Sequence, residues 1–114
     1  MVDAGFKVHR TLGPGLLESV YEACLGRELE LRGIPFERQR PIPVHYEGLD
    51  LDQGFRIDLF VASSIVVELK AVDKIQPIHE AQILTYLKLS KVRLGLLINF
   101  NVRLFKEGVR RFVL

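Results

Sequence analysis

The sequence predicts an α/β (α+β) domain in which a mixed β-sheet lies between helices, and three patterns lead to this prediction. Residues 16–32 repeat apolar side chains at spacings of three and four, the period of an amphipathic helix. Residues 54–71 alternate apolar side chains with period two, as half-buried strands do. Residues 93–100 (RLGLLINF) are so apolar that they should form a central strand covered on both faces.

Length and composition indicate one folded unit. The chain has 114 residues, enough for one hydrophobic core and too few for two, so we expect a single domain over residues 1–114. No apolar run approaches the roughly 20 residues of a membrane span, and the first residues lack the apolar centre of a signal peptide. We therefore expect no membrane association and a cytoplasmic location. The one cysteine, Cys24, is expected to fill the core.

The charges are unevenly distributed along the chain. Residues 83–114 contain seven Lys or Arg and one Glu, which gives +6, whereas the whole chain carries +2 and residues 1–82 therefore carry −4. A basic flank beside an acidic cluster suits a polyanion such as a nucleic acid. A solvated basic surface explains the same charges equally well.

The N-terminal part should contain two helices. Residues 3–12 predict a short helix with Asp3 as its N-cap and Phe6 as its main apolar anchor, interrupted by the Gly-Pro-Gly of residues 13–15. The helix over residues 16–32 should end where Gly33 adopts a left-handed conformation and Pro35 prevents continuation. Its expected apolar side is formed by Leu17, Val20, Tyr21, Cys24, Leu25 and Leu29.

The remaining elements follow from local signals. Residues 36–46 should be extended, and two prolines confine this strand to an edge or a bulge. Residues 47–53 are expected to be a polar connector, and residues 72–77 a loop. Residues 78–90 predict a helix, and residues 109–114 a last strand after a turn at residues 106–108. The helix over residues 78–90 should bury Ile83, Leu84 and Leu87.

The central hairpin carries charges that are unexpected in such apolar strands. Asp58 lies in the middle of the first strand, with Phe55, Ile57, Leu59 and Val61 expected on the opposite face. In the second strand Glu68 and Lys70 share one face, and the hairpin should bring Asp58 beside them. Buried charges without partners cost several kcal/mol each. A divalent metal ion would compensate the two carboxylates.

These residues fit a catalytic Mg²⁺ site. Mg²⁺ takes oxygen ligands and keeps several waters, so Asp58 and Glu68 can supply two ligands and the carbonyl of Leu69 a third. Glu18, at the start of the helix over residues 16–32, could bind the same ion through water or help to hold a second one. Mn²⁺ is an alternative cation. Such an ion would acidify a bound water and neutralise charge on a phosphate.

Three further residues could assist the chemistry. Lys70 could orient the water or stabilise the pentavalent phosphorus. Gln82 and Tyr86 could position phosphate or the Lys70 ammonium, and with His79 they form a polar stripe on the helix over residues 78–90. Polar groups at the edge of the core would produce the same stripe, so both interpretations remain open.

Five segments, GPGLLESVYE, GFRIDLFV, IVVELKAVD, HEAQILTYLKL and LGLLINFNV, closely resemble the GxxExxY protein family, a small branch of the PD-(D/E)XK nuclease-like superfamily. The resemblance runs from about residue 8 to residue 113, and Gly15, Glu18 and Tyr21 provide the letters of the family name. It implies a restriction-endonuclease-like core, a mixed central sheet flanked by helices. It also implies that the site consists of the helix acid Glu18, the strand acid Asp58, the triplet Glu68-Leu69-Lys70, and Gln82 with Tyr86.

Three functions compete at this stage. The first is a Mg²⁺-dependent nuclease, with DNA favoured over RNA as the substrate. The second is a non-catalytic nucleic-acid- or protein-binding module on the same fold. A structural metal protein is disfavoured because suitable Cys and His ligands are missing, and the acids at 47, 50 and 52 lack the full calcium-loop pattern. A homodimer or a partner protein is also plausible, through the edges of the strands over residues 36–46 and 109–114.

Overall fold

The computed structural model describes residues 1–52 and 54–114. This part of the chain forms three α-helices and five strands, and one short 3-10 helix, η1, precedes the last strand. The elements are α1 (Val2–Leu12), α2 (Glu18–Leu31), β1 (Phe36–Tyr46), β2 (Leu49–Val61), β3 (Ile65–Lys70), α3 (Pro77–Ser90), β4 (Leu94–Asn99), η1 (Phe105–Glu107) and β5 (Val109–Val113).

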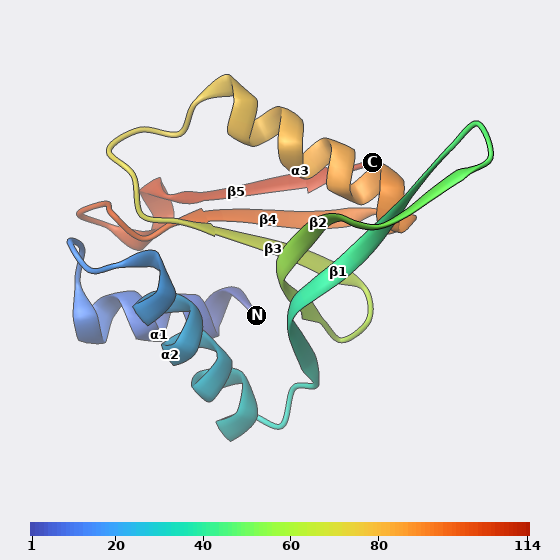
Figure 1. Ribbon diagram of the computed structural model, residues 1–114. Coiled ribbons are helices and arrows are strands. Elements are labelled where there is room, and N and C mark those ends of the chain that lie inside the picture. Colours follow the sequence, from blue (N-terminus) through green and yellow to red (C-terminus); the bar gives the residue numbers. More distant parts are fainter.

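The strands form one mixed sheet in the order β1-β2-β3-β4-β5. β3 and β4 are parallel and are joined by α3, whereas the other neighbouring strands are antiparallel. Figure 1 shows α3 on one face of the sheet and α1 with α2 on the other. This arrangement confirms the predicted fold class, a mixed sheet between helices.

The core has two halves, one on each face of the sheet. On the α1 and α2 face, Tyr21, Leu25 and Leu29 pack against strand residues such as Ile98, and all four are 0% exposed. On the α3 face, buried helix residues pack against Leu97 and its neighbours. Consecutive residues of β4 thus face opposite halves, which confirms that this strand is central and covered on both sides.

The start of α1 differs from the prediction. Met1 occupies the N-cap position without a side-chain hydrogen bond, so the assignment of Asp3 as the cap was wrong. Asp3 lies in the first turn, where its negative charge interacts favourably with the positive end of the helix dipole. Phe6 is 49% exposed, while Ala4 and Val8 are the buried anchors. The Phe6 ring instead packs edge-on against Phe105, at 6.2 Å between centroids.

The buried stripes of α2 and α3 are narrower than predicted. In α2 the buried apolar residues follow one row at a spacing of four, and Cys24 packs half-buried at its edge. Leu17 and Val20 are 73% and 37% exposed, and in α3 Leu84 is 39% exposed, so these three assignments to the core were wrong. Each helix packs against one face of the sheet, and a single row of its side chains makes that contact. Apolar residues beside this row therefore remain exposed. Gly33 has φ +69° just after α2, as predicted.

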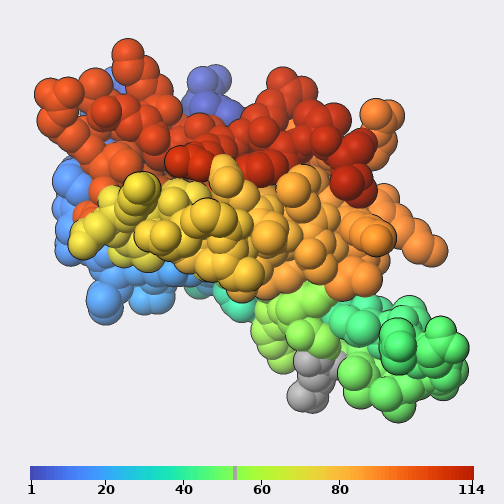
Figure 2. Space-filling model, turned by 90° about the horizontal axis from the view of Figure 1, so that it is seen from above, coloured from blue at the N-terminus to red at the C-terminus, as the bar shows by residue number. Residues whose placement is uncertain are grey.

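The predicted connector at residues 47–53 is mostly strand. Glu47 and Gly48 form a tight turn with φ of +47° and +83°, and β2 begins at Leu49. Position 53 lies outside the described residues. The sequence did not predict this hairpin turn because its first residue, at positive φ, is a Glu, whereas such turns normally place Asn, Asp or Gly there. β1 and β2 thus extend into a two-stranded arm that stands clear of the body in both views (Figures 1 and 2).

The other boundaries agree closely with the sequence. β1 is an edge strand with the predicted bounds, and Pro77 is the first residue of α3. The expected turn at residues 106–108 is replaced by η1 and Gly108. None of the helices in the described part of the chain has the length and apolarity needed to cross a membrane.

Candidate functional site

Asp58 and Glu68 lie at the point where β2 and β3 part. The last cross-strand pair before the break is Leu59 with Val67. Beyond it, the backbone amide of Asp58 donates to the Glu68 carboxylate at 3.2 Å, and the backbone amide of Leu69 donates to the Asp58 carboxylate at 2.8 Å. The two acids therefore satisfy backbone groups that the ladder would otherwise have paired. Their side chains lie together in the gap between the strands.

The ladder between β1 and β2 is also interrupted at Asp58. Arg38 pairs with Leu59 and Arg40 with Ile57, but the intervening pair is missing, and Gln39 has φ +52°. Ile57 packs on the α3 face and Leu59 on the α1 and α2 face, although they are two residues apart. The prediction that the alternate residues from 55 to 61 share one face was therefore wrong. The interruption shifts the alternation by one residue at Asp58.

The site places two acidic side chains next to each other in a buried environment. Glu68 is 7% exposed, and burial, with a further contribution from the charge of Asp58, raises its pKa to about 8. Burial also raises the pKa of Asp58, although the hydrogen bonds from Leu69 and Gln39 oppose this shift. The raised pKa values mean that the surrounding protein groups do not fully stabilise the ionised forms of these two adjacent carboxyl groups.

Glu18 is the first residue of α2 and belongs to the same electrostatic cluster. Although the residue is exposed, partial desolvation of its carboxyl group raises the pKa, as does the negative charge of Asp58, while Lys70 lowers it. The preceding loop is held by Tyr21, whose hydroxyl donates to the carbonyl of Gly13 at 2.6 Å and accepts from the amide of Leu16 at 3.1 Å. Tyr21 is itself fixed by stacking on Phe100, with centroids 4.5 Å apart.

Lys70 ends β3 and is half-buried. Its positive charge lowers the pKa values of Glu18, Asp58 and Glu68, so the ammonium lies near all three acids. In residues 1–52 and 54–114, however, it has no carboxylate oxygen within 4.0 Å. Its three N–H donors are therefore not committed to a salt bridge.

The polar stripe of α3 divides into two roles. Tyr86 is half-buried, and burial raises its pKa, as do the negative charges of Glu68 and Asp58. Its ring stacks on Phe55, with centroids 4.1 Å apart. Gln82 lies half-buried one turn earlier on the helix. His79 accepts a hydrogen bond from the backbone amide of Gln76 at 3.0 Å, so it caps the helix.

Two residues that contact the candidate site were not identified from the sequence. The side-chain amide of Gln39 donates to Glu22 at 2.6 Å and to Asp58 at 3.2 Å. Glu22 is buried and also accepts from Arg38 at 3.0 Å. The polar run of β1 gave no sign of this contact, because a kink at a residue other than glycine has no sequence signature. The sequence offered only one signal, a second acid at Glu22, one helical turn after Glu18.

Comparison with known protein families identifies the relationship. The family model described as PD-(D/E)XK nuclease superfamily matches residues 1–112. The chain belongs to the PD-(D/E)XK nuclease superfamily. The mixed sheet flanked by helices is therefore the restriction-endonuclease-like fold that the resemblance implied. Neither a curated protein nor a solved structure gives a significant match.

PD-(D/E)XK nucleases generally use divalent metal ions, and the donor set here suits one. Oxygen donors are what Mg²⁺ prefers, and the charge of Asp58 and Glu68 calls for a cation. Within residues 1–52 and 54–114, no group of three or more His, Cys, Asp or Glu side chains is arranged to hold a metal ion. In the arm, Oδ1 of Asp50 lies 2.6 Å from Nδ1 of His45.

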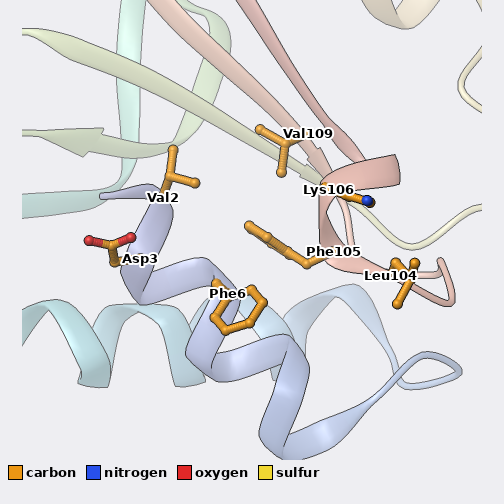
Figure 3. Close-up of a pocket in the computed structure, with 7 residues that line it drawn as sticks. All are labelled: Val2, Asp3, Phe6, Leu104, Phe105, Lys106 and Val109. Carbon is orange, nitrogen blue, oxygen red and sulfur yellow. The ribbon is translucent and has the colours of Figure 1, made fainter.

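A cavity of about 490 Å³ lies between α1 and the η1 region. Figure 3 shows the ring of Phe6 next to that of Phe105, with Val2 and Val109 above the two rings in this view. Its lining is mainly apolar and includes none of the residues expected to bind metal. The cavity is therefore separate from Asp58 and Glu68.

Proposed function

We propose that this protein is a divalent-metal-dependent nuclease that hydrolyses phosphodiester bonds, with DNA favoured over RNA. The observation that carries the proposal is the pairing of Asp58 with Glu68 at the break between β2 and β3, followed by Lys70 at the end of β3. Membership of the PD-(D/E)XK superfamily supports it. The GxxExxY branch is the one that the motif residues Gly15, Glu18 and Tyr21 favour.

The metal ion would be Mg²⁺, with Mn²⁺ as an alternative. Asp58 and Glu68 would hold it, the carbonyl of Leu69 would be a further ligand, and Glu18 would bind through water or help to hold a second ion. Bound there, the ion would acidify a water and neutralise negative charge on the phosphate. Because two side-chain carboxylates leave several positions open, water and substrate would complete the coordination.

The neighbouring side chains would act on the substrate. Among the described residues Lys70 makes no salt bridge, and its charge acts on the acids, so it would orient the attacking water or stabilise charge on the phosphorus centre. Tyr86, fixed by stacking on Phe55, would position phosphate, and Gln82 would assist from the previous turn. Each role depends on the presence of the phosphate beside the acids.

The macromolecular partner would be a nucleic acid. The basic last third of the chain would contact its backbone, and the superfamily makes DNA the first choice. A second copy or a partner protein would extend the small contact surface, through the exposed edges of β1 and β5. We place this activity in the cytoplasm and in a single domain.

One observation favours a second candidate, a non-catalytic nucleic-acid- or protein-binding module. In the part of the chain that the structure describes, no third acid joins Asp58 and Glu68 to complete a metal-binding group. A domain that retained the fold after losing catalysis would look similar. This module would bind nucleic acid without cutting it.

A cleavage assay separates the two candidates. Purified protein is incubated with single-stranded, duplex and branched DNA and with RNA, in Mg²⁺ or Mn²⁺. Asp58→Ala and Lys70→Ala are compared with Asp50→Ala and Lys74→Ala, which remove the same charges at exposed positions. The nuclease proposal expects cleavage by the wild type and both control variants, and a loss of orders of magnitude in the two site variants. Equal cleavage by all five proteins, or binding without cleavage, would contradict it.

A further inference from the structure

The backbone of β1 is distorted where it passes Asp58. Gln39 has φ +52°, a left-handed conformation that residues other than glycine rarely adopt. The cross-strand pairs on either side of it are regular, so the distortion is confined to this residue. Strain of this kind persists only where the surroundings impose it, and it is frequent at functional sites.

The distortion directs one side-chain amide at two acids from different elements. The Nε2 atom of Gln39 donates to Oε1 of Glu22 in α2 at 2.6 Å and to Oδ1 of Asp58 in β2 at 3.2 Å. An amide nitrogen has two hydrogens, so it can serve both acceptors at once. Gln39 therefore links the helix that carries Glu18 to the strand that carries Asp58.

The other side of each acid is also held. Glu22 Oε2 accepts from the Arg38 guanidinium at 3.0 Å, which leaves Oε1 for Gln39. Asp58 Oδ2 accepts from the amide of Leu69 at 2.8 Å, which leaves Oδ1 for Gln39. The Asp58 carboxylate is thus fixed at both oxygens, from β1 on one side and from β3 on the other. Its orientation is set before any ligand arrives.

We propose that Gln39 is a positioning residue that, anchored by Glu22, orients the Asp58 carboxylate for binding a divalent metal ion. This inference rests on the proposed function, because it takes Asp58 as a metal ligand. Groups that orient a metal ligand typically change metal affinity or activity by about 10- to 100-fold when they are removed. Gln39 does not contact the substrate in this scheme and acts only through Asp58.

Glycine is the informative replacement, because it adopts positive φ without strain. Gln39→Gly removes both hydrogen bonds and leaves the backbone free to keep its conformation. Gln39→Asn is the second variant, since asparagine also tolerates this conformation but is one methylene shorter and cannot span the two acids. The matched control is Glu47→Gly, which makes the same backbone change at φ +47° in the turn of the arm.

The test combines calorimetric titration of Mn²⁺, melting temperature and steady-state cleavage of duplex DNA. Gln39→Gly and Gln39→Asn should weaken Mn²⁺ binding about 10- to 100-fold and lower kcat, with little change in the KM for DNA. Gln39→Gly should remain cooperatively folded, because glycine adopts the positive φ without strain, and Glu47→Gly should bind Mn²⁺ normally.

Two results would overturn the inference alone. One is Mn²⁺ binding and kcat within twofold of the wild type in Gln39→Gly. The other is a lower melting temperature in Gln39→Gly with unchanged Mn²⁺ affinity, which would make Gln39 a strand residue only. Asp58→Asn distinguishes failure of the proposed function, because Mn²⁺ binding equal to that of the wild type in this variant, or no binding in any protein, would overturn both.

Discussion

The backbone amide of Asp58 donates to the carboxylate of Glu68 across strands that have already separated. Side chains here replace the backbone pairs of the sheet, so the acids are also part of the fold. The arrangement places two carboxyl groups with raised pKa values beside each other.

Replacing Glu68 should change how stability depends on pH. Its pKa is about 8 in the folded protein and about 4.5 in the unfolded chain. Between these values the native state holds a proton that the unfolded chain has released, so the free energy of unfolding falls as pH rises. The slope from this group approaches about 1.4 kcal/mol per pH unit.

Urea unfolding of wild type and Glu68→Gln, in the presence of a chelator from pH 5 to pH 8.5, measures this effect. Gln cannot ionise, so the variant should lose less stability over this range and be the more stable protein at the alkaline end. Parallel curves for the two proteins would show that Glu68 has an ordinary pKa.

Lys70→Met should abolish catalysis but spare metal binding, since Lys70 lies near the acids and is not a ligand. Loss of a group that stabilises developing charge typically costs about 10²- to 10³-fold in kcat. Cleavage rates and Mn²⁺ titrations of the variant give the two quantities. Lys74→Met, at an exposed position four residues later, should leave both unchanged. Loss of metal binding in Lys70→Met would assign Lys70 a structural role instead.

Tyr21→Phe should destabilise the protein by about 0.5–1.5 kcal/mol, because it removes the hydrogen bonds of the hydroxyl while the groups left behind can still reach water. The hydroxyl donates to Gly13 and accepts from Leu16, which fixes the loop before Glu18. The ring can still stack on Phe100, so packing is preserved. Denaturant titration of the variant measures the cost, and Tyr46→Phe, at a side chain that is 69% exposed, is the control. Equal stability of both variants would rule out this role for the hydroxyl.

Tyr86→Phe should raise the KM for DNA while the protein remains as stable as the wild type. The substitution keeps the aromatic stack on Phe55 and removes only the hydroxyl near Glu68 and Asp58. A positioning hydroxyl contributes to substrate binding, so KM should rise several-fold with a smaller change in kcat. If KM and kcat both stay at wild-type values, Tyr86 serves only to pack the edge of the core.

The sequence predicted the elements better than the details that shape the site. Periodicity located the helices and strands, and the apolar run of β4 correctly indicated a central strand. It also suggested that Asp58 and Glu68 lie side by side, because two short strands with a tight turn allow few registers. The sequence did not predict correctly which face of the sheet each residue of β2 occupies, because the distortion at Gln39 reverses the alternation at Asp58.

Gln39 illustrates why the details of the site could not be predicted from the sequence. Its left-handed backbone depends on contacts with Glu22 and Asp58, which are 17 and 19 residues away in sequence. Local propensity at such a position favours an ordinary strand, and tertiary contacts override it. The arm was missed for a related reason, because Glu47 adopts a conformation that its residue type disfavours.

The central claim, that Asp58 and Glu68 together bind one divalent cation, is tested most directly by thermal unfolding with increasing Mn²⁺. A ligand that binds only the folded state stabilises it by about 2.7 kcal/mol at 100 times its Kd. The melting temperature of the wild type and of Asp50→Asn should rise with Mn²⁺, and that of Asp58→Asn and Glu68→Gln should not. The same rise in all four proteins, or no rise in the wild type, would contradict the claim.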